Sequence, residues 1–323
     1  MHNDDREKIP LTHADIGART VFSPYRPAGS ATLFRDVGGM DALKELARIK
    51  IVTPFKRPEL FKKFKKQAGG GILLYGPPGC GKTFLAKAIA GECGAAFFNV
   101  GIDDILDMYV GNSERNVAGL FDAARAQRPA VLFIDEIDAL GRRRDLTRHS
   151  AATSVANTFL SEMDGLASSN ESILVLGATN AIWDVDAAFK RPGRFDRVLF
   201  APPPDRPGRE AILRLALEGM PVAALDLARL AERTDFFSGA DLKALVDRAA
   251  ESVLDEIVRM GEERLLEQED LEDALRDMRP STLEWLEIAK NYVEYANESG
   301  LYNELKRYLE QTATTTKRLG FGR

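Results

Sequence analysis

Short apolar runs alternate with longer amphipathic stretches along the first two thirds of the chain. Continuous apolar runs bounded by turn residues are typical of buried strands, and apolar positions repeating about every 3.6 residues are typical of helices. Their alternation favours an α/β fold, a parallel sheet with helices on both faces, which binds ligands beyond the carboxyl ends of its strands. The predicted strands are residues 71–75, 96–100, 130–134 and 173–179, and the predicted helices between them are residues 84–93, 113–127 and 151–163.

The pattern becomes wholly helical after the three prolines at positions 202–204. A small all-helical subdomain is therefore expected, followed by one or two amphipathic helices at 282–311 that residues 297–300 can separate. Residues 1–32 contain several prolines and are expected to form an extended arm or linker. The helices of the small subdomain are predicted at residues 207–217, 225–233, 239–260 and 269–277. The predicted organisation is an arm at 1–32, a large α/β subdomain at 33–201, a helical subdomain at 202–279 and a helical extension at 280–323.

Composition narrows the class of protein only a little. A chain of 323 residues with 45% hydrophobic and 29% charged residues has an ordinary globular composition. A net charge of −5 and a pI near 5.5 disfavour nucleic acid as a partner, although a local basic face stays open. The apolar runs are too short for a membrane span, and the polar N-terminus shows no secretory signal. Cys80 and Cys93 lack metal-like neighbours, which favours a reducing, cytoplasmic location.

Residues 76–83 match the phosphate-loop pattern G-x-x-x-x-G-K-[ST] between a predicted strand and a predicted helix. Backbone N–H groups of such a loop point at phosphates, Lys82 can reach the β and γ phosphates, and the Thr83 hydroxyl can ligate Mg²⁺. The alternative is a plain Gly-Pro turn. Because Cys80 lies in this loop near a helix N-terminus, we expect its thiolate to be favoured and its alkylation to block nucleotide binding.

Polar residues follow two further predicted strands. Asp135 and Glu136 end the apolar run at 131–134, where Asp135 can orient the Mg²⁺ shell and Glu136 can act as general base toward an attacking water. Acidic residues also cap many helices, so this pair alone is weak evidence for catalysis. Together with the phosphate loop it indicates nucleotide hydrolysis. Asn180 ends the strand at 173–179 and can contact the γ phosphate or the water, with an ordinary turn asparagine as the alternative.

The segment 190–197 is dense in arginine beside a Pro-Gly turn. Arg191 and Arg194 can serve as arginine fingers that stabilise charge on a transferring phosphoryl group. Such fingers often come from a neighbouring subunit, so this interpretation implies an oligomer. The alternative is a solvated basic loop.

Taken in order, these motifs resemble those of the AAA ATPases, in the branch of valosin-containing protein, katanin, spastin and the AAA proteases, over residues 34–277. The resemblance identifies residues 76–83 as Walker A, 131–136 as Walker B, 178–180 as sensor 1 and 163–166 as a segment that signals between subunits. It implies ATP and Mg²⁺ as ligands, catalytic roles for Lys82, Glu136, Asn180, Arg191 and Arg194, and a metal site at Thr83 and Asp135. The nucleotide contacts that it implies are Val37, Gly38, Gly76, Pro77, Pro78, Gly79, Cys80, Gly81, Lys82, Thr83, Phe84, Gly239 and Ala240.

The same resemblance implies a homo-hexameric ring whose central pore grips a polypeptide substrate. Met108, Tyr109 and Val110 fall at the first pore loop of the family, with a core tyrosine before the next helix as the alternative. Residues 141–149 fall at the second pore loop, with a solvated basic loop as the alternative. Ala216 stands where many members carry a histidine near the nucleotide, so base or ribose contacts are expected to differ. Residues 279–281 and the helix after them faintly resemble the C-terminal helix of the katanin and spastin group.

The leading function is thus an ATP-driven motor that remodels, unfolds or disassembles proteins by threading. A nucleic-acid motor or loader and a nucleotide-gated scaffold are the two alternatives. The arm is too short for a folded module, so either an adaptor recruits the substrate or an N-terminal domain is missing from the sequence.

Overall fold

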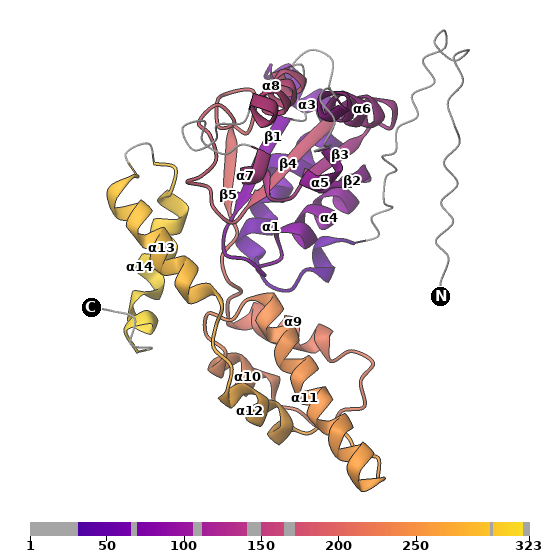
Figure 1. Ribbon diagram of the computed structural model, residues 1–323, viewed down its shortest axis with the longest axis vertical. Coiled ribbons are helices and arrows are strands. Elements are labelled where there is room, and N and C mark those ends of the chain that lie inside the picture. Colours follow the sequence, from indigo (N-terminus) through magenta and orange to yellow (C-terminus); the bar gives the residue numbers. More distant parts are fainter. Residues whose placement is uncertain are drawn as a thin grey trace.

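The computed structural model describes residues 32–65, 70–105, 112–140, 150–164, 172–297 and 300–318 (Figure 1). It contains a five-stranded, all-parallel sheet in the order β2-β3-β4-β1-β5. The predicted α/β fold class is confirmed. The strands are β1 (Gly70–Tyr75), β2 (Ala96–Val100), β3 (Ala130–Ile134), β4 (Ile173–Thr179) and β5 (Arg197–Phe200).

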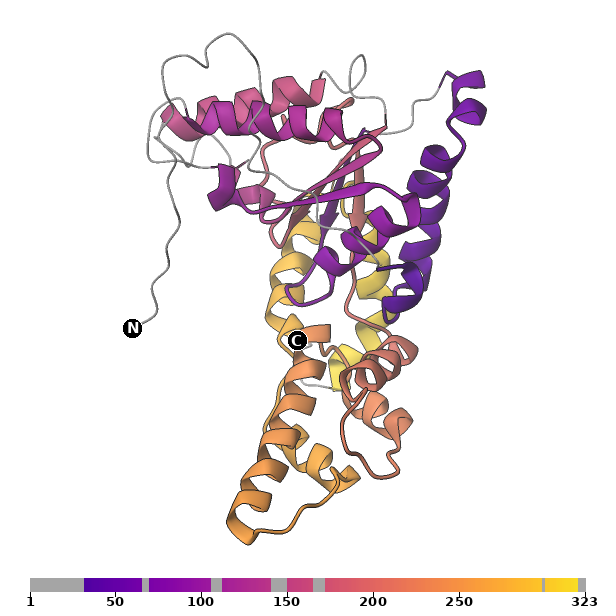
Figure 2. The same ribbon diagram turned by 90° about the vertical axis from the view of Figure 1, so that its right-hand side faces the viewer.

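Both faces of the sheet are buried, and the sequence of each strand determines which residues lie on which face. Neighbouring residues of a strand point to opposite faces, so Leu73 and Tyr75 join one hydrophobic core while Ile72 and Leu74 join the other. Helices cover both faces, as Figure 2 shows. One core is closed by α4 (Lys82–Cys93) and the segment before β1, and the other by α6 (Asn112–Ala126) and α8 (Ser150–Asp164).

Strand order determines which polar residues meet at the carboxyl edge. Strand β4 lies between β1 and β3, with Tyr75 opposite Thr179 and Ile134 opposite Gly177. Asn180, which follows β4, is therefore central, with the phosphate loop on one side and the acidic pair after β3 on the other.

Several elements are absent from the sequence prediction. Strand β5 pairs with β1 at the edge of the sheet, in a segment that the sequence assigned to a basic loop and the run leading to the prolines. No element was predicted between residues 33 and 70, where the chain forms a series of short helices. The unpredicted helices are η2 (Phe34–Asp36), α1 (Asp41–Ala47), η3 (Arg48–Val52), α2 (Thr53–Lys56), α3 (Pro58–Lys63), α5 (Ile102–Ile105) and α7 (Ile137–Leu140).

The lid is the helical subdomain formed by α9 to α12, drawn in orange shades in Figure 1. It has a hydrophobic core of its own, which includes Leu213, Leu230 and Leu245. All four predicted helices are present. They are α9 (Arg206–Ala216), α10 (Leu227–Arg233), α11 (Gly239–Met260) and α12 (Gln268–Arg276).

The C-terminal extension forms two helices rather than one, α13 (Thr282–Tyr295) and α14 (Asn303–Arg318), called here the C-terminal helix pair. Its Trp285 and Leu305 belong to the same core as Leu73 and Tyr75 of β1. The ring of Tyr292 stacks on Trp183 with centroids 4.5 Å apart. The helix pair is thus packed into the large subdomain, although the lid precedes it in the chain.

Some predictions fall outside the described residues. These are the pore-loop residues Met108, Tyr109 and Val110, the second pore loop at 141–149, the second half of the 163–166 segment and nearly all of the arm at 1–32. Within the described part, none of the helices combines the length and the apolar character that a membrane crossing needs.

Candidate functional site: a phosphate loop beneath a helical lid

The phosphate loop owes its shape to glycine. Gly79 and Gly81 have φ angles of +72° and +75°, a left-handed conformation that glycine adopts without the steric penalty of a side chain. Gly81 is also the residue before α4, so the loop passes directly into a helix N-terminus. Main-chain N–H groups at such a terminus favour anions.

Gly79 also lets the lid approach. A Cβ atom added at Gly79 would lie 2.8 Å from Ser238 Oγ and 2.9 Å from Ala240 Cβ, both at the start of α11. The Ala240 N–H donates a hydrogen bond to the Gly79 carbonyl oxygen at 3.2 Å. A Cβ on Gly239 would lie 3.2 Å from that same oxygen. The fold therefore brings the phosphate loop together with the two lid residues that were predicted to approach the nucleotide.

Lys82 connects the loop to Asn180. Its Nζ donates to the carbonyl oxygens of Gly76 and Pro77, each at 2.9 Å, and to Asn180 Oδ1 at 2.6 Å. The residue is only 7% exposed, and burial lowers the pKa of its ammonium to about 8. The chain's own oxygens thus accept the hydrogen bonds that Lys82 is expected to give to phosphate.

Thr83 and Asp135 form a second pair across the carboxyl edge. The Thr83 hydroxyl donates to Asp135 Oδ2 at 2.9 Å, although the two residues come from α4 and the end of β3. A hydroxyl and a carboxylate at this spacing supply the hard oxygen ligands that Mg²⁺ prefers. The residues present therefore fit the metal that the sequence suggested.

Glu136, the residue after Asp135, has an exposed side chain and a backbone φ angle of +53°. A residue with a side chain pays a steric cost in this conformation, and such strain clusters at functional sites. Its backbone N–H donates to Asp135 Oδ1 at 3.0 Å, which helps to fix the turn. The chain thus presents an accessible carboxylate beside the Thr83–Asp135 pair.

Two residues fix the strand end before Asn180: Thr179, which the sequence placed in the 178–180 motif without a role of its own, and Asp138, which it did not single out. The Thr179 hydroxyl donates to Asp138 Oδ1 at 2.6 Å and accepts the Ala181 N–H at 2.9 Å. Thr179 is only 1% exposed. The available signal was the spacing of Asp138, three residues after Asp135 in the acidic segment.

Val37 and Gly38, which the family resemblance places among the nucleotide contacts, pack near the first lid helix. Val37 is buried, and a Cβ on Gly38 would lie 2.6 Å from Ile212 Cγ1 of α9. Ile212 also comes within 3.8 Å of the Cβ position of Gly239. Ile212 is thus a further candidate for a base contact, and only its inward position on the predicted helix hinted at it. Ala216, the departure from the family pattern, is the last residue of α9.

The two candidate arginine fingers differ. Arg191 is exposed, and its guanidinium has no hydrogen bond or ion pair with any residue that the structure describes, although its backbone carbonyl accepts the Arg194 N–H at 3.1 Å. The guanidinium of Arg194 instead clasps Asp164 of α8 through two hydrogen bonds of 2.8 Å and donates to the Ala188 carbonyl. This hydrogen bonding by Arg194 lowers the pKa of Asp164. Arg194 is thus held by its own chain.

The expectation of a reactive Cys80 is wrong. Its side chain is only 2% exposed, and burial raises the pKa of the thiol to about 12, with Lys82 offsetting only part of the effect. A buried thiol disfavours the charged form more than a nearby helix N-terminus favours it. Phe84, at the far side of the loop, is 42% exposed.

The fold and site together define a phosphate-loop nucleotide-binding protein with a helical lid. Two family descriptions match the chain: "ATPase family associated with various cellular activities (AAA)" over residues 72–203 and "AAA+ lid domain" over residues 224–273. The chain belongs to the AAA ATPase family.

Two relatives refine the comparison. The solved structure of the FIGL-1 AAA domain is similar with a TM-score of 0.72 and 32% identity, over 84% of this chain and 93% of that one. The "Putative cell division cycle ATPase" of Plasmodium falciparum (isolate 3D7) is 41% identical over 239 residues. That match spans 73% of this chain and 19% of the relative, so the chain corresponds to about a fifth of the length of that protein.

Proposed function

We propose that this chain is an ATP-hydrolysing motor that remodels, unfolds or disassembles proteins, acting as a hexamer that threads polypeptide through its pore. The observation that carries the hydrolytic part is the meeting of Lys82, Asn180 and Asp135 at the carboxyl edge of three neighbouring strands, next to an exposed Glu136. The family and the FIGL-1 likeness support a motor in general terms.

The chemistry follows from the positions of the side chains. On binding ATP, Lys82 exchanges the carbonyls of Gly76 and Pro77 for phosphate oxygens, which its mobile ammonium can do without a change of fold. Asn180, freed from Lys82, orients the attacking water, and the Glu136 carboxylate accepts its proton as the water oxygen bonds to the γ phosphorus. The bond from the γ phosphorus to the β–γ bridging oxygen breaks, and that oxygen leaves on ADP with the electron pair. Thr83 and Asp135 would hold Mg²⁺, which when bound neutralises charge on the phosphates.

The arginines support an oligomer. Charge that develops on the γ phosphoryl group needs a cation that is free to reach it, and the exposed Arg191 fits that role in a neighbouring subunit. Arg194, clasped by Asp164, is suited to hold the segment that carries Arg191, or to act after Asp164 releases it.

Hydrolysis and threading are tested together by phosphate release and substrate unfolding, measured for three versions of the chain. Glu136→Gln should bind ATP normally and hydrolyse it on the order of 10²-fold more slowly, because an amide cannot accept the proton. Tyr109→Ala, at the predicted pore loop, should hydrolyse ATP but fail to unfold a tagged substrate, because aromatic side chains supply the grip.

The outcomes separate the candidate functions. Normal turnover in Glu136→Gln would remove that residue from the base role. A Tyr109→Ala chain that is stable and still unfolds substrate would refute threading. Stimulation of the wild-type ATPase by single-stranded nucleic acid, and not by unfolded protein, would favour the nucleic-acid motor, and no stimulation by either would favour the scaffold.

A further inference from the structure

One residue of the C-terminal helix pair touches the backbone of the candidate active site. The indole N–H of Trp285 donates a 2.5 Å hydrogen bond to the main-chain carbonyl oxygen of Asn180. Trp285 is 8% exposed, and Phe200 and Trp183 lie against it with ring centroids 6.2 and 5.6 Å away. The aromatic cluster therefore fixes the indole, and the indole fixes the Asn180 peptide.

The same helix is bound to the lid one turn earlier. Ser281, just before α13, donates to Asp241 Oδ2 from its backbone N–H at 3.1 Å and from its hydroxyl at 2.8 Å. The Thr282 hydroxyl donates to the Phe236 carbonyl at 2.5 Å. Asp241 is the residue after Ala240, whose N–H meets the phosphate loop at Gly79. A single turn of α13 thus spans from the lid cap to Asn180.

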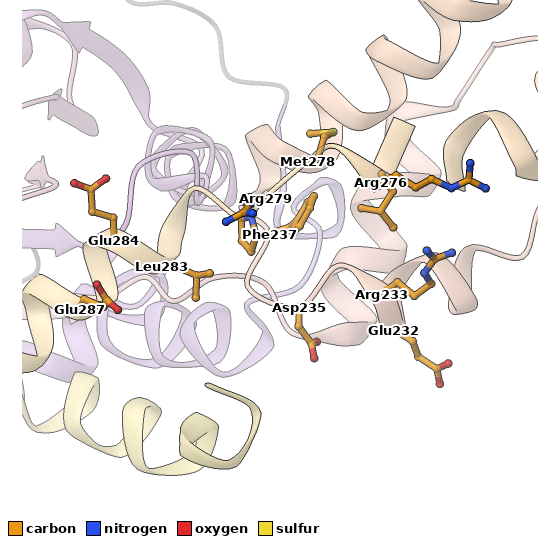
Figure 3. Close-up of a pocket in the computed structure, with 12 residues that line it drawn as sticks. Glu232, Arg233, Asp235, Phe237, Arg276, Met278, Arg279, Leu283, Glu284 and Glu287 are labelled. Carbon is orange, nitrogen blue, oxygen red and sulfur yellow. The ribbon is translucent and has the colours of Figure 1, made fainter. Parts of the chain in front are cut away.

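Beyond that turn, open space separates α13 from the lid. A hollow of about 780 Å³ lies between them (Figure 3). Leu283, Glu284 and Glu287 of α13 line one side, and Glu232 and Arg276 of the lid line the other. The hydrogen bonds that join α13 to the lid are therefore those at Ser281, and they lie at one end of the hollow.

We infer that Trp285 is a positioning residue for Asn180, and that the first turn of α13 carries the position of the lid to it. The carbonyl and the side chain of Asn180 share one Cα, so holding the carbonyl limits where the Oδ1 now bonded to Lys82 can move. The inference rests on the proposed function, because it assigns Trp285 a role through a residue of the proposed hydrolytic site.

The test compares two tryptophans of the same cluster. Trp285→Phe keeps an aromatic ring and removes the N–H donor, whereas Trp183→Phe shortens a ring that is equally buried but has no hydrogen bond to Asn180. We expect Trp285→Phe to lower kcat about 3- to 10-fold, the range for one lost hydrogen bond, and to leave the Kd of a non-hydrolysable ATP analogue within about 2-fold. Trp183→Phe keeps an aromatic ring against Trp285 and leaves the Trp285 N–H in place, so its kcat should fall clearly less than that of Trp285→Phe.

A double mutant asks whether the effect passes through Asn180. In an Asn180→Ala chain, Trp285→Phe should cause no further loss of kcat, because the amide that it positions is already gone. An equal loss in both backgrounds would overturn the inference, and so would equal losses in Trp285→Phe and Trp183→Phe or a wild-type kcat in Trp285→Phe.

A fluorescence arm is independent of turnover. The chain has two tryptophans, so Trp183→Phe leaves Trp285 as the sole emitter. Binding of the analogue should shift its emission, because Lys82 then leaves Asn180, and Asn180→Ala should reduce that shift. A Trp285 emission spectrum that does not change when the analogue binds would overturn the inference. A chain that binds ATP without hydrolysing it would refute the proposed function alone, since this arm would still give its result.

Discussion

The lid and the C-terminal helix pair both contact the sheet subdomain, yet they do so by opposite means. The lid has its own core and meets the phosphate loop through Gly79, Gly239 and one backbone hydrogen bond from Ala240. The helix pair places Trp285 and Leu305 inside the core that also holds β1. A contact made of glycine and backbone can open at small cost, whereas one made of buried rings cannot.

The two contacts differ in charge as well. The phosphate loop that the lid meets leads into a helix with a buried ammonium, that of Lys82, whereas the helix pair packs among aromatic rings. The lid side is therefore poised to respond to a ligand, and the helix-pair side serves as a fixed support.

The largest expected effect is the loss of stability when one fully buried leucine in each region is replaced by alanine. Leu305 and Leu245 are both fully buried, so Leu305→Ala and Leu245→Ala should each cost about 2–5 kcal/mol of stability. Hydrogen exchange should distinguish them. Leu305→Ala should speed exchange in β5, where the Phe200 N–H is bonded to Glu304, and Leu245→Ala should speed exchange in the lid alone. Equal exchange patterns would show that the two regions are one cooperative unit.

The buried ammonium predicts a pH dependence on the lid side. Because the folded chain releases the Lys82 proton near pH 8 and the unfolded chain near 10.5, Lys82 contributes stability that grows with pH across that window. The buried Cys80 and Cys93 thiols contribute with the opposite sign, because their raised pKa keeps protons on the folded chain. The gain from Lys82 is on the order of 3 kcal/mol, measured by urea unfolding without nucleotide. Lys82→Met should remove this contribution, so its stability should rise less steeply, or fall more steeply, with pH than that of the wild-type chain. The same slope in both chains would contradict the assignment.

The smallest effect isolates the lid contact itself. Gly79→Ala and Gly94→Ala both put a side chain on a left-handed residue, and each should cost on the order of 1 kcal/mol. Only at Gly79 would the new Cβ meet the lid, since the space around Gly94 is open. Nucleotide affinity should therefore fall about 10-fold or more in Gly79→Ala and stay unchanged in Gly94→Ala, as titration calorimetry would show. A parallel loss in both variants would mean that the lid contact is irrelevant to binding.

The sequence predicted those elements whose position depends on the local pattern of apolar and polar residues. The loop at 76–83 and the acidic pair were found because each follows a continuous apolar run, and the lid helices because their apolar positions repeat at helical spacing. It could not predict β5, a short edge strand that begins at Arg197 and gains its pairing from β1. It gave no sign that β4 lies between β1 and β3, because strand order depends on crossovers between distant segments.

Long-range side-chain contacts were equally hidden. Apolar clustering around Trp285 indicated burial, but nothing linked its N–H to a carbonyl 105 residues away. For Cys80, the nearby helix N-terminus was visible in the sequence and the burial that outweighs it was not. Both cases need the packed structure, since burial and hydrogen-bond partners depend on the whole fold.

The left-handed backbone at Glu136 has a consequence for how this position tolerates change. A side chain in that conformation costs about 1 kcal/mol or more, which glycine would remove and asparagine would reduce. The backbone thus favours one residue type while the proposed chemistry requires another. Selection of variants for heat resistance alone would drift away from glutamate here, and selection for ATP turnover would restore it. If Glu136 is the general base as proposed, stability and activity are traded against each other at this single residue.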